Sequence, residues 1–106
     1  MAWANIPREQ RVEGLIDALI LTAISAVEPV KANRYVDAKA QTTDQADRMR
    51  LDLELLFPLT DELRAANRIP TAAQTRARAE SMAELTEKEV LKALSEYAQI
   101  VRNHAW

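Results

Sequence analysis

Residues 48–59, RMRLDLELLFPL, decide the fold because their apolar side chains fit two different secondary structures. Every second residue from 49 to 57 is apolar, which is typical of a half-buried strand. Met49, Leu53 and Phe57 are also spaced four residues apart, which fits one face of a helix. The residues that precede the stretch distinguish the two readings.

A helix start lies just upstream of this stretch. Thr42 followed by Gln45 forms a capping box, in which two side chains pair with backbone donors that would otherwise lack partners. Leu and Met stand in the stretch in place of β-branched residues, and no second alternating segment is present to pair with it. We therefore predict a helix from Thr43 that is apolar on two sides, with Leu51 and Leu55 nearly opposite its main apolar face.

Composition supports the same fold class for the whole chain. The 106 residues include one Gly and four Pro, which is too little turn chemistry for a protein built from hairpins. The length fits one domain over residues 1–106 with a modest core. We predict an all-α bundle of about four to five helices, packed antiparallel, with a long C-terminal helix.

The first helix is expected to run from about Arg8 to Val27. Pro7 suits the start of a helix because the N–H that it lacks would have no partner there. Pro29 predicts a kink or short break, and Gly14 is expected to allow close packing against a neighbouring helix. The apolar stripe of this segment is broad, which predicts a central helix.

Two more breaks are expected before the C-terminal region. Pro58 ends or bends the preceding helix, and Thr60 with the acids after it predicts a restart that reaches about Arg68. Residues 67–71, NRIPT, predict a loop, because a residue before proline is pushed out of helical geometry and Thr71 can cap the next helix.

The C-terminal region leaves two readings open. One apolar stripe keeps its phase from Ala72 to about Asn103, which favours a single long helix. Against this, Thr86 and Glu89 form a second capping box, which would start a new helix at Glu87. We expect the continuous helix and keep the break as the alternative.

Several function classes are excluded or disfavoured by composition. The chain has no cysteine, so thiol redox chemistry and thiolate metal sites are excluded. A net charge of −2 gives no global attraction to nucleic acid or anionic lipid. The longest apolar run, residues 15–27, is shorter than the roughly 20 residues that span a bilayer, and no signal peptide is evident. We expect a cytoplasmic protein without membrane contact.

No residue pattern points to catalysis or to a cofactor. His104 is the single histidine, and we interpret it as a favourable cation at a helix C-terminus. Carboxylates spaced four residues apart read as a solvated acidic face, since one His cannot complete a di-metal bundle site. Asp17, beside Ile16 and Ala18, is the one carboxylate that an enzyme hypothesis would require to be buried. We expect no catalytic residue, no metal and no cofactor.

A run of arginines without acids lies between residues 64 and 79. It contains Arg64, Arg68, Arg76 and Arg78. If these side chains converge at one end of the bundle, they would meet an acidic protein patch or the phosphates of a nucleic acid; plain solvation of the four arginines is the alternative. Without interleaved aromatic residues, nucleic acid is the weaker of these partners.

The remaining apolar residues exceed what one small core needs, and they form our predicted interface: Leu51, Leu55, Trp3 and Trp106. The alternative is that these residues cover one another inside a five-helix monomer. We therefore expect a non-enzymatic structural or assembly subunit that self-associates or docks into a larger complex, such as a virion or adaptor component. The alternative is a small nucleic-acid-associated or regulatory protein that uses the arginines. A third possibility, an enzyme built around Asp17, is the least supported.

Overall fold

The computed structural model describes residues 2–30 and 58–106, and these confirm the all-α class. They form helices and no strand. The elements are a short 3-10 helix η1 (Trp3–Asn5), α1 (Arg8–Val27), α4 (Ala72–Met82) and α5 (Glu87–Arg102), and residues 58–65 are helical as well. The helix predicted from Thr43, with Leu51 and Leu55, lies outside the described residues.

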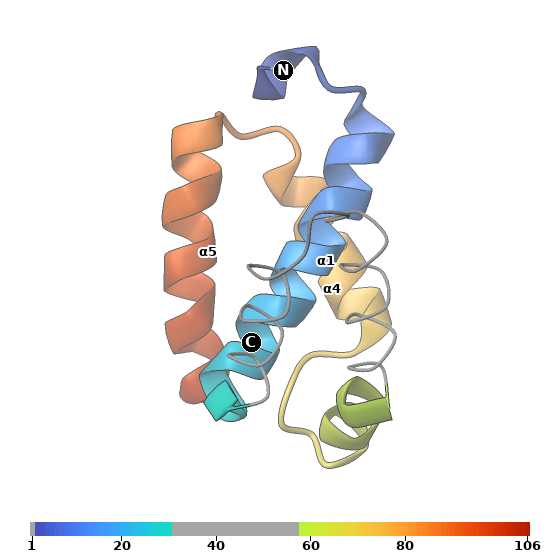
Figure 1. The fold of residues 1–106 in the computed structure, drawn as a ribbon, viewed down its shortest axis with the longest axis vertical. Coiled ribbons are helices and arrows are strands. Elements are labelled where there is room, and N and C mark those ends of the chain that lie inside the picture. Colours follow the sequence, from blue (N-terminus) through green and yellow to red (C-terminus); the bar gives the residue numbers. More distant parts are fainter. Residues whose placement is uncertain (1, 31–57) are drawn as a thin grey trace, which may run out of the picture.

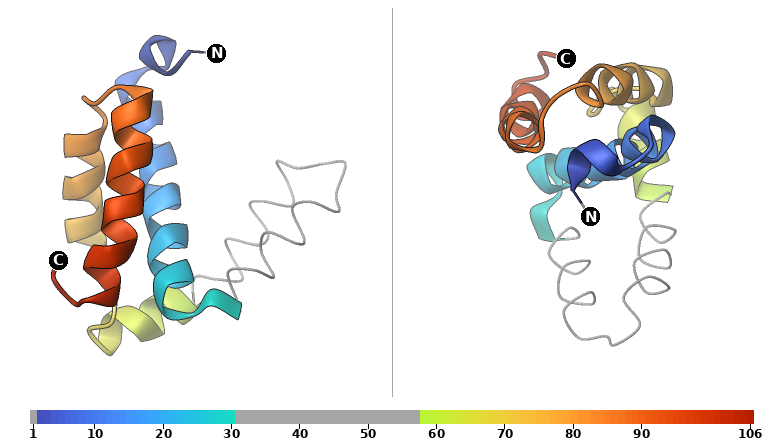
Figure 2. Two further views of the ribbon diagram at one scale, coloured as in Figure 1. Left: turned by 90° about the vertical axis from the view of Figure 1, so that its left-hand side faces the viewer. Right: turned by 90° about the horizontal axis from the view of Figure 1, so that it is seen from above.

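The three long helices of the described part pack side by side around α1. Both α4 and α5 contact α1, and Figure 2 shows the three helices as a triangle when viewed along their axes. α4 runs opposite to α1, whereas α5 runs in the same direction as α1, so packing is not antiparallel throughout (Figure 1). The 58–65 helix lies across the end of the bundle at which α1 ends and α4 begins (Figures 1 and 2).

The predicted bounds of the first helix are confirmed. Pro7 is the N-cap of α1, and the helix ends at Val27 with Glu28 outside helical geometry. Residues 29 and 30 are helical again, so the expected break stands directly before Pro29. A proline N–H is not available to continue the ladder of hydrogen bonds, which explains the break at this position.

The core is formed where α1 meets α4 and α5. On α1 it comprises six buried residues: Val12, Leu15, Leu19, Ile20, Ala23 and Ile24. From the other elements it includes Leu63, Ile69, Ala79, Met82, Ala83, Val90, Tyr97 and Val101. This arrangement makes α1 the central helix, as its broad apolar stripe predicted.

Gly14 does not allow close helix packing, and that prediction is wrong. The residue is exposed, and a Cβ atom added to it would have no neighbour within 4 Å. A glycine at an exposed position within a helix carries an entropic cost relative to alanine, and Gly14 gains no packing contact that would offset this cost. The single glycine of the sequence therefore explains no feature of the packing.

The single long helix expected over residues 72–103 is also wrong. α4 ends at Met82, and α5 begins at Glu87. The hydroxyl of Thr86 accepts a hydrogen bond from the backbone N–H of Glu89 at 3.3 Å, and the Glu89 carboxylate accepts one from the N–H of Thr86 at 3.0 Å. This capping box gives the first turn of α5 its missing partners, and it prevails over the continuous apolar stripe.

The segment between residues 58 and 71 follows the predicted loop but not the predicted restart. Residues 58–60 are already helical, so Thr60 lies inside a helix, fully buried, and does not cap one. The helix ends in a pair of hydrogen bonds from Asn67 N–H to Arg64 O and from Arg68 N–H to Leu63 O, with Asn67 at a φ of 57°. These two bonds form a Schellman motif, and Asn adopts the left-handed backbone conformation that the motif requires more readily than most residues do.

Candidate functional site

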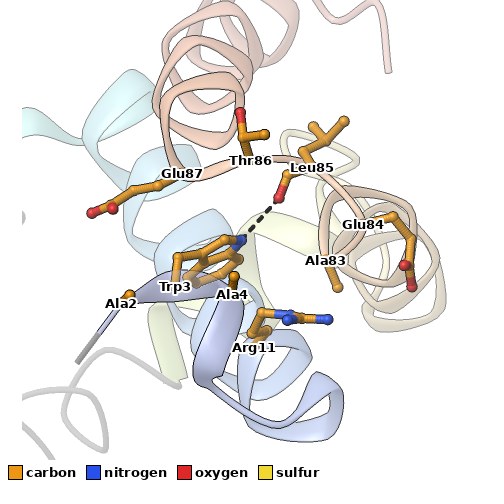
Figure 3. A pocket seen from close by; sticks show the side chains of 9 residues that line it. All are labelled: Ala2, Trp3, Ala4, Arg11, Ala83, Glu84, Leu85, Thr86 and Glu87. Atoms are coloured by element: carbon orange, nitrogen blue, oxygen red, sulfur yellow. Dashed lines mark hydrogen bonds between the residues drawn. The ribbon is translucent and has the colours of Figure 1, made fainter.

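Trp3 fixes the N-terminal segment to the turn between α4 and α5. Its indole Nε1 donates a hydrogen bond to the carbonyl oxygen of Leu85 at 2.9 Å, as the dashed line in Figure 3 shows. The guanidinium carbon of Arg11 lies 5.9 Å from the centre of the indole ring, within the range of a cation–π contact. The ring is half-buried and packs against the core, so only part of Trp3 remains available to a partner.

A hollow of about 410 Å³ lies beside Trp3. It is lined by Ala2, Trp3, Ala4, Arg11, Ala83, Glu84, Leu85, Thr86 and Glu87 (Figure 3). None of these side chains is a histidine or cysteine, and Thr86, which caps α5, is the only hydroxyl among them. The hydroxyl of Thr86 donates to Oε1 of Glu89 at 2.8 Å as part of the capping box at the start of α5.

Two of the three charged residues that line this hollow, Glu84 and Arg11, are engaged within the chain. Arg8 and Glu84 form an ion pair with 2.6 Å between Nε and Oε1, and the carboxylate of Glu84 raises the pKa of Arg8. Arg11 donates from Nη1 to the carbonyl oxygen of Ile6 at 3.1 Å. These contacts connect the N-terminal segment to the α4–α5 end of the bundle, whereas the buried Nε of Arg11 has no hydrogen-bond partner in the described part of the chain.

Trp106 lies at the opposite end of the bundle. Its ring is half-buried and its centre lies 5.1 Å from that of the His104 ring. It also lines a hollow of about 350 Å³ together with residues of α4 and the loop before it: Pro70, Gln74, Ala77, Arg78 and Ser81. The two tryptophans of the predicted interface therefore lie at separate ends, and each is partly covered by its own chain.

Three of the four predicted arginines have partners in the described part of the chain. Arg64 donates from Nε to the carbonyl oxygen of Pro70 at 3.0 Å. Arg76 pairs with Glu13 of α1 at 3.0 Å, and the guanidinium carbon of Arg78 lies 5.0 Å from the centre of the Tyr97 ring. Arg68 is exposed. The structure brings Arg64 and Arg78 near the same tyrosine, whereas Arg76 reaches to another helix.

The carboxylate singled out for an enzyme hypothesis does not lie in either hollow. Asp17 is exposed on α1. Partial desolvation on the helix surface raises its pKa, and the nearby charge of Glu13 raises it further. Within residues 2–30 and 58–106, no three His, Cys, Asp or Glu side chains gather as a metal site would require.

His104 terminates α5 in an unusual backbone conformation. Its φ is 54°, and its N–H donates to Val101 O at 3.1 Å while the N–H of Ala105 donates to Ile100 O at 3.0 Å. These two bonds form a Schellman motif, whose left-handed residue is usually glycine. The sole histidine therefore occupies a helix-ending position, where its ring is exposed and contacts Trp106.

Replacement of His104 by glycine is expected to raise the free energy of unfolding by about 0.5–1 kcal/mol, because glycine adopts a positive φ without steric strain. Urea denaturation followed by circular dichroism measures the change. His104→Asn serves as the matched control and should give a smaller gain, since Asn tolerates this region. A loss of stability in His104→Gly would show that the ring contact with Trp106 outweighs the backbone strain.

The described residues leave two large apolar side chains open to solvent. Val30 and Leu91 each expose 64% of their surface. Leu91 lies on α5, and helical spacing places it on one side with Leu94 and Ala98, which are both half-buried. These three residues form a strip that flanks the core, which we call the Leu91 strip. This strip was not identified from the sequence. The signal that could have revealed it is the position of Leu91 outside the apolar stripe that runs through α5.

No known protein family, curated protein or solved structure matches the chain. Among the helices that the structure describes, none combines the length and apolar composition needed to cross a bilayer. The inference of function therefore rests on the residues and contacts described above.

Proposed function

We propose that the protein is a non-enzymatic assembly subunit that associates with further copies of itself, as a component of a larger complex. The observation that supports this most directly is the Leu91 strip. Leu91 is 64% exposed in the middle of a helix whose buried face already forms part of the core. Single exposed apolar side chains are common on monomers, but Leu91 continues into half-buried Leu94 and Ala98, and contiguous apolar patches mark association surfaces.

The electrostatics favour this function over the alternative with an arginine patch. A surface that recognises phosphates needs several guanidinium groups with donors to spare. Here the guanidinium of Arg76 is paired with Glu13, and that of Arg78 packs over Tyr97. These contacts direct Arg76 toward α1 and Arg78 toward α5, so the two guanidinium groups do not converge as a phosphate site requires. We therefore expect no salt-sensitive retention of the protein on DNA or RNA columns.

The two hollows do not favour catalysis. The larger one, beside Trp3, contains side chains that serve as caps, ion pairs and anchors within the chain. An enzyme site needs convergent polar groups that are held ready for a substrate. The anchoring role of Trp3 and Arg8 instead supports a rigid surface at this end of the bundle, which suits a structural subunit.

Substitution of Leu91 by glutamine tests this function. We expect the wild-type chain to show a mass above 11.9 kDa by light scattering at high micromolar concentration. Leu91→Gln should weaken association about tenfold, because burial of a leucine side chain contributes about 1.5 kcal/mol or more. The exposed neighbour Lys92 provides the matched control, and Lys92→Gln should leave association unchanged. A wild-type chain that remains monomeric up to millimolar concentration contradicts the proposal.

A further inference from the structure

The turn over residues 83–86 joins α4 to α5 without any residue that forbids a helix. It contains neither Gly nor Pro, and none of its four residues has a positive φ. Ala83 still has helical backbone angles, with φ −62° and ψ −19°. Thr86, with φ −70° and ψ 161°, is extended. Rotation about a few backbone bonds near Thr86 would therefore allow the helix to continue through the turn.

The buried faces of α4 and α5 are in phase across this turn. α4 buries Thr75, Ala79 and Met82, and α5 buries Val90, Tyr97 and Val101. At about 100° per residue, all six fall within about a third of the circumference of a single continuous helix. A straightened α4–α5 segment would thus present one continuous apolar stripe, of which α4 covers the first half and α5 the second.

The side-chain hydrogen bonds and ion pairs that hold the turn bent are few and mostly exposed. They are the capping box between Thr86 and Glu89, the hydrogen bond from Trp3 to the Leu85 carbonyl oxygen, and the ion pair between Arg8 and Glu84. In a continuous helix the N–H of Glu89 would donate to the Leu85 carbonyl oxygen. In the bent form this N–H donates to the hydroxyl of Thr86, and the Leu85 carbonyl oxygen accepts from Trp3. The bent and straight forms therefore compete for the same backbone groups.

We propose that the 83–86 turn is a hinge that opens into a continuous helix and exchanges α5 between two copies of the chain. α5 would leave its own α1 and pack on α1 of a second copy, which would return its own α5. Val90, Tyr97 and Val101 would then remake the same buried contacts, so that the two forms differ mainly at the turn. This inference rests on the proposed self-association and names one route for it.

Thr86→Leu tests the hinge by removal of the cap. Loss of an N-cap hydroxyl disfavours the bent form about fivefold per chain, and a dimer contains two turns, so dimerisation should strengthen about 25-fold. Size-exclusion chromatography with light scattering should then show a separate peak at twice 11.9 kDa. In the protein from that peak, the ¹³Cα chemical shift of residue 86 should have a value typical of an α-helix. Thr86→Asp, which keeps a capping oxygen, should behave as the wild type.

Glu87→Pro is the complementary variant, because it favours the bent form over the continuous helix. Residue 87 is the first residue of α5, a position that suits proline, and the extended Thr86 before it is compatible with a following proline. In a continuous helix the same proline would be internal and would disfavour the straight form about 100-fold per chain. The double variant Thr86→Leu with Glu87→Pro should therefore lose the added dimerisation and return to the association state of the wild type, although it lacks the cap. Circular dichroism checks that each variant is folded.

The outcomes separate this inference from the proposed function. A dimeric Thr86→Leu with a helical residue 86, reversed by Glu87→Pro, supports the exchange. A dimer whose residue 86 stays extended and which Leu91→Gln weakens overturns the hinge and leaves surface association standing. A monomeric Thr86→Leu overturns the hinge as well. If that variant does not fold, Trp3→Phe, which removes the Nε1 donor to Leu85 and keeps an aromatic ring, replaces it with the same criteria.

Discussion

Replacement of Tyr97 by alanine is expected to lower the free energy of unfolding by about 3–5 kcal/mol, which is the range for loss of a buried aromatic side chain. Tyr97 is 1% exposed and is the largest of the fully buried side chains. It also lies under the guanidinium of Arg78, so its loss removes a contact between α5 and α4 as well as core volume. Urea denaturation, followed by far-ultraviolet circular dichroism, measures the change.

Tyr97→Phe is the control that separates the ring from its hydroxyl. In the part of the chain that the structure describes, the hydroxyl is buried and has no hydrogen-bond partner. Removal of an unpaired buried hydroxyl should raise stability by about 1 kcal/mol. A decrease of similar size would contradict this and would show that the hydroxyl does find a partner.

The raised pKa of Tyr97 predicts how the free energy of unfolding changes at alkaline pH. Burial raises the pKa of Tyr97 above its ordinary value of 10.0, while the charges of Arg78 and Arg64 partly oppose the shift. The folded state therefore favours the neutral phenol, and this contribution is complete below pH 10 and is lost as the pH rises through the higher folded pKa. Tyr97→Phe should not show this loss, which distinguishes it from general alkaline unfolding.

The helices were predicted well where local chemistry alone determines them. Pro7 and Pro29 restrict the backbone of their own neighbours, so the bounds of α1 follow from the sequence. Thr71 was likewise expected to cap α4, although Gln74, which completes its capping box, was not recognised. The continuous helix over 72–103 failed because an apolar stripe that stays in phase does not reveal a four-residue turn.

The candidate site was less predictable because its contacts join distant parts of the chain. Nothing in the sequence near Arg76 indicates that its partner is Glu13, 63 residues earlier. In the same way, Trp3 finds its acceptor at Leu85. A run of charges or a terminal tryptophan shows which groups are present, whereas the packing of α1 decides which of them are already engaged.

The small residue at the contact of α4 with α1 leads to the second large effect. Ala79 is 0% exposed and belongs to the core cluster. A larger side chain at this position has no space, so Ala79→Leu should lower the free energy of unfolding by about 1–3 kcal/mol through displaced neighbours. Urea denaturation again measures the change.

Ala77 provides the matched control for this substitution because it is exposed on the same helix, two residues earlier. Ala77→Leu changes the same atoms and has nearly the same effect on helix propensity, so it should alter stability by less than about 0.5 kcal/mol. The difference between the two variants isolates the close approach of α4 to α1. If both leave stability unchanged, the helices have room to separate, and α4 would then be held to α1 by its neighbouring contacts and not by the fit at Ala79.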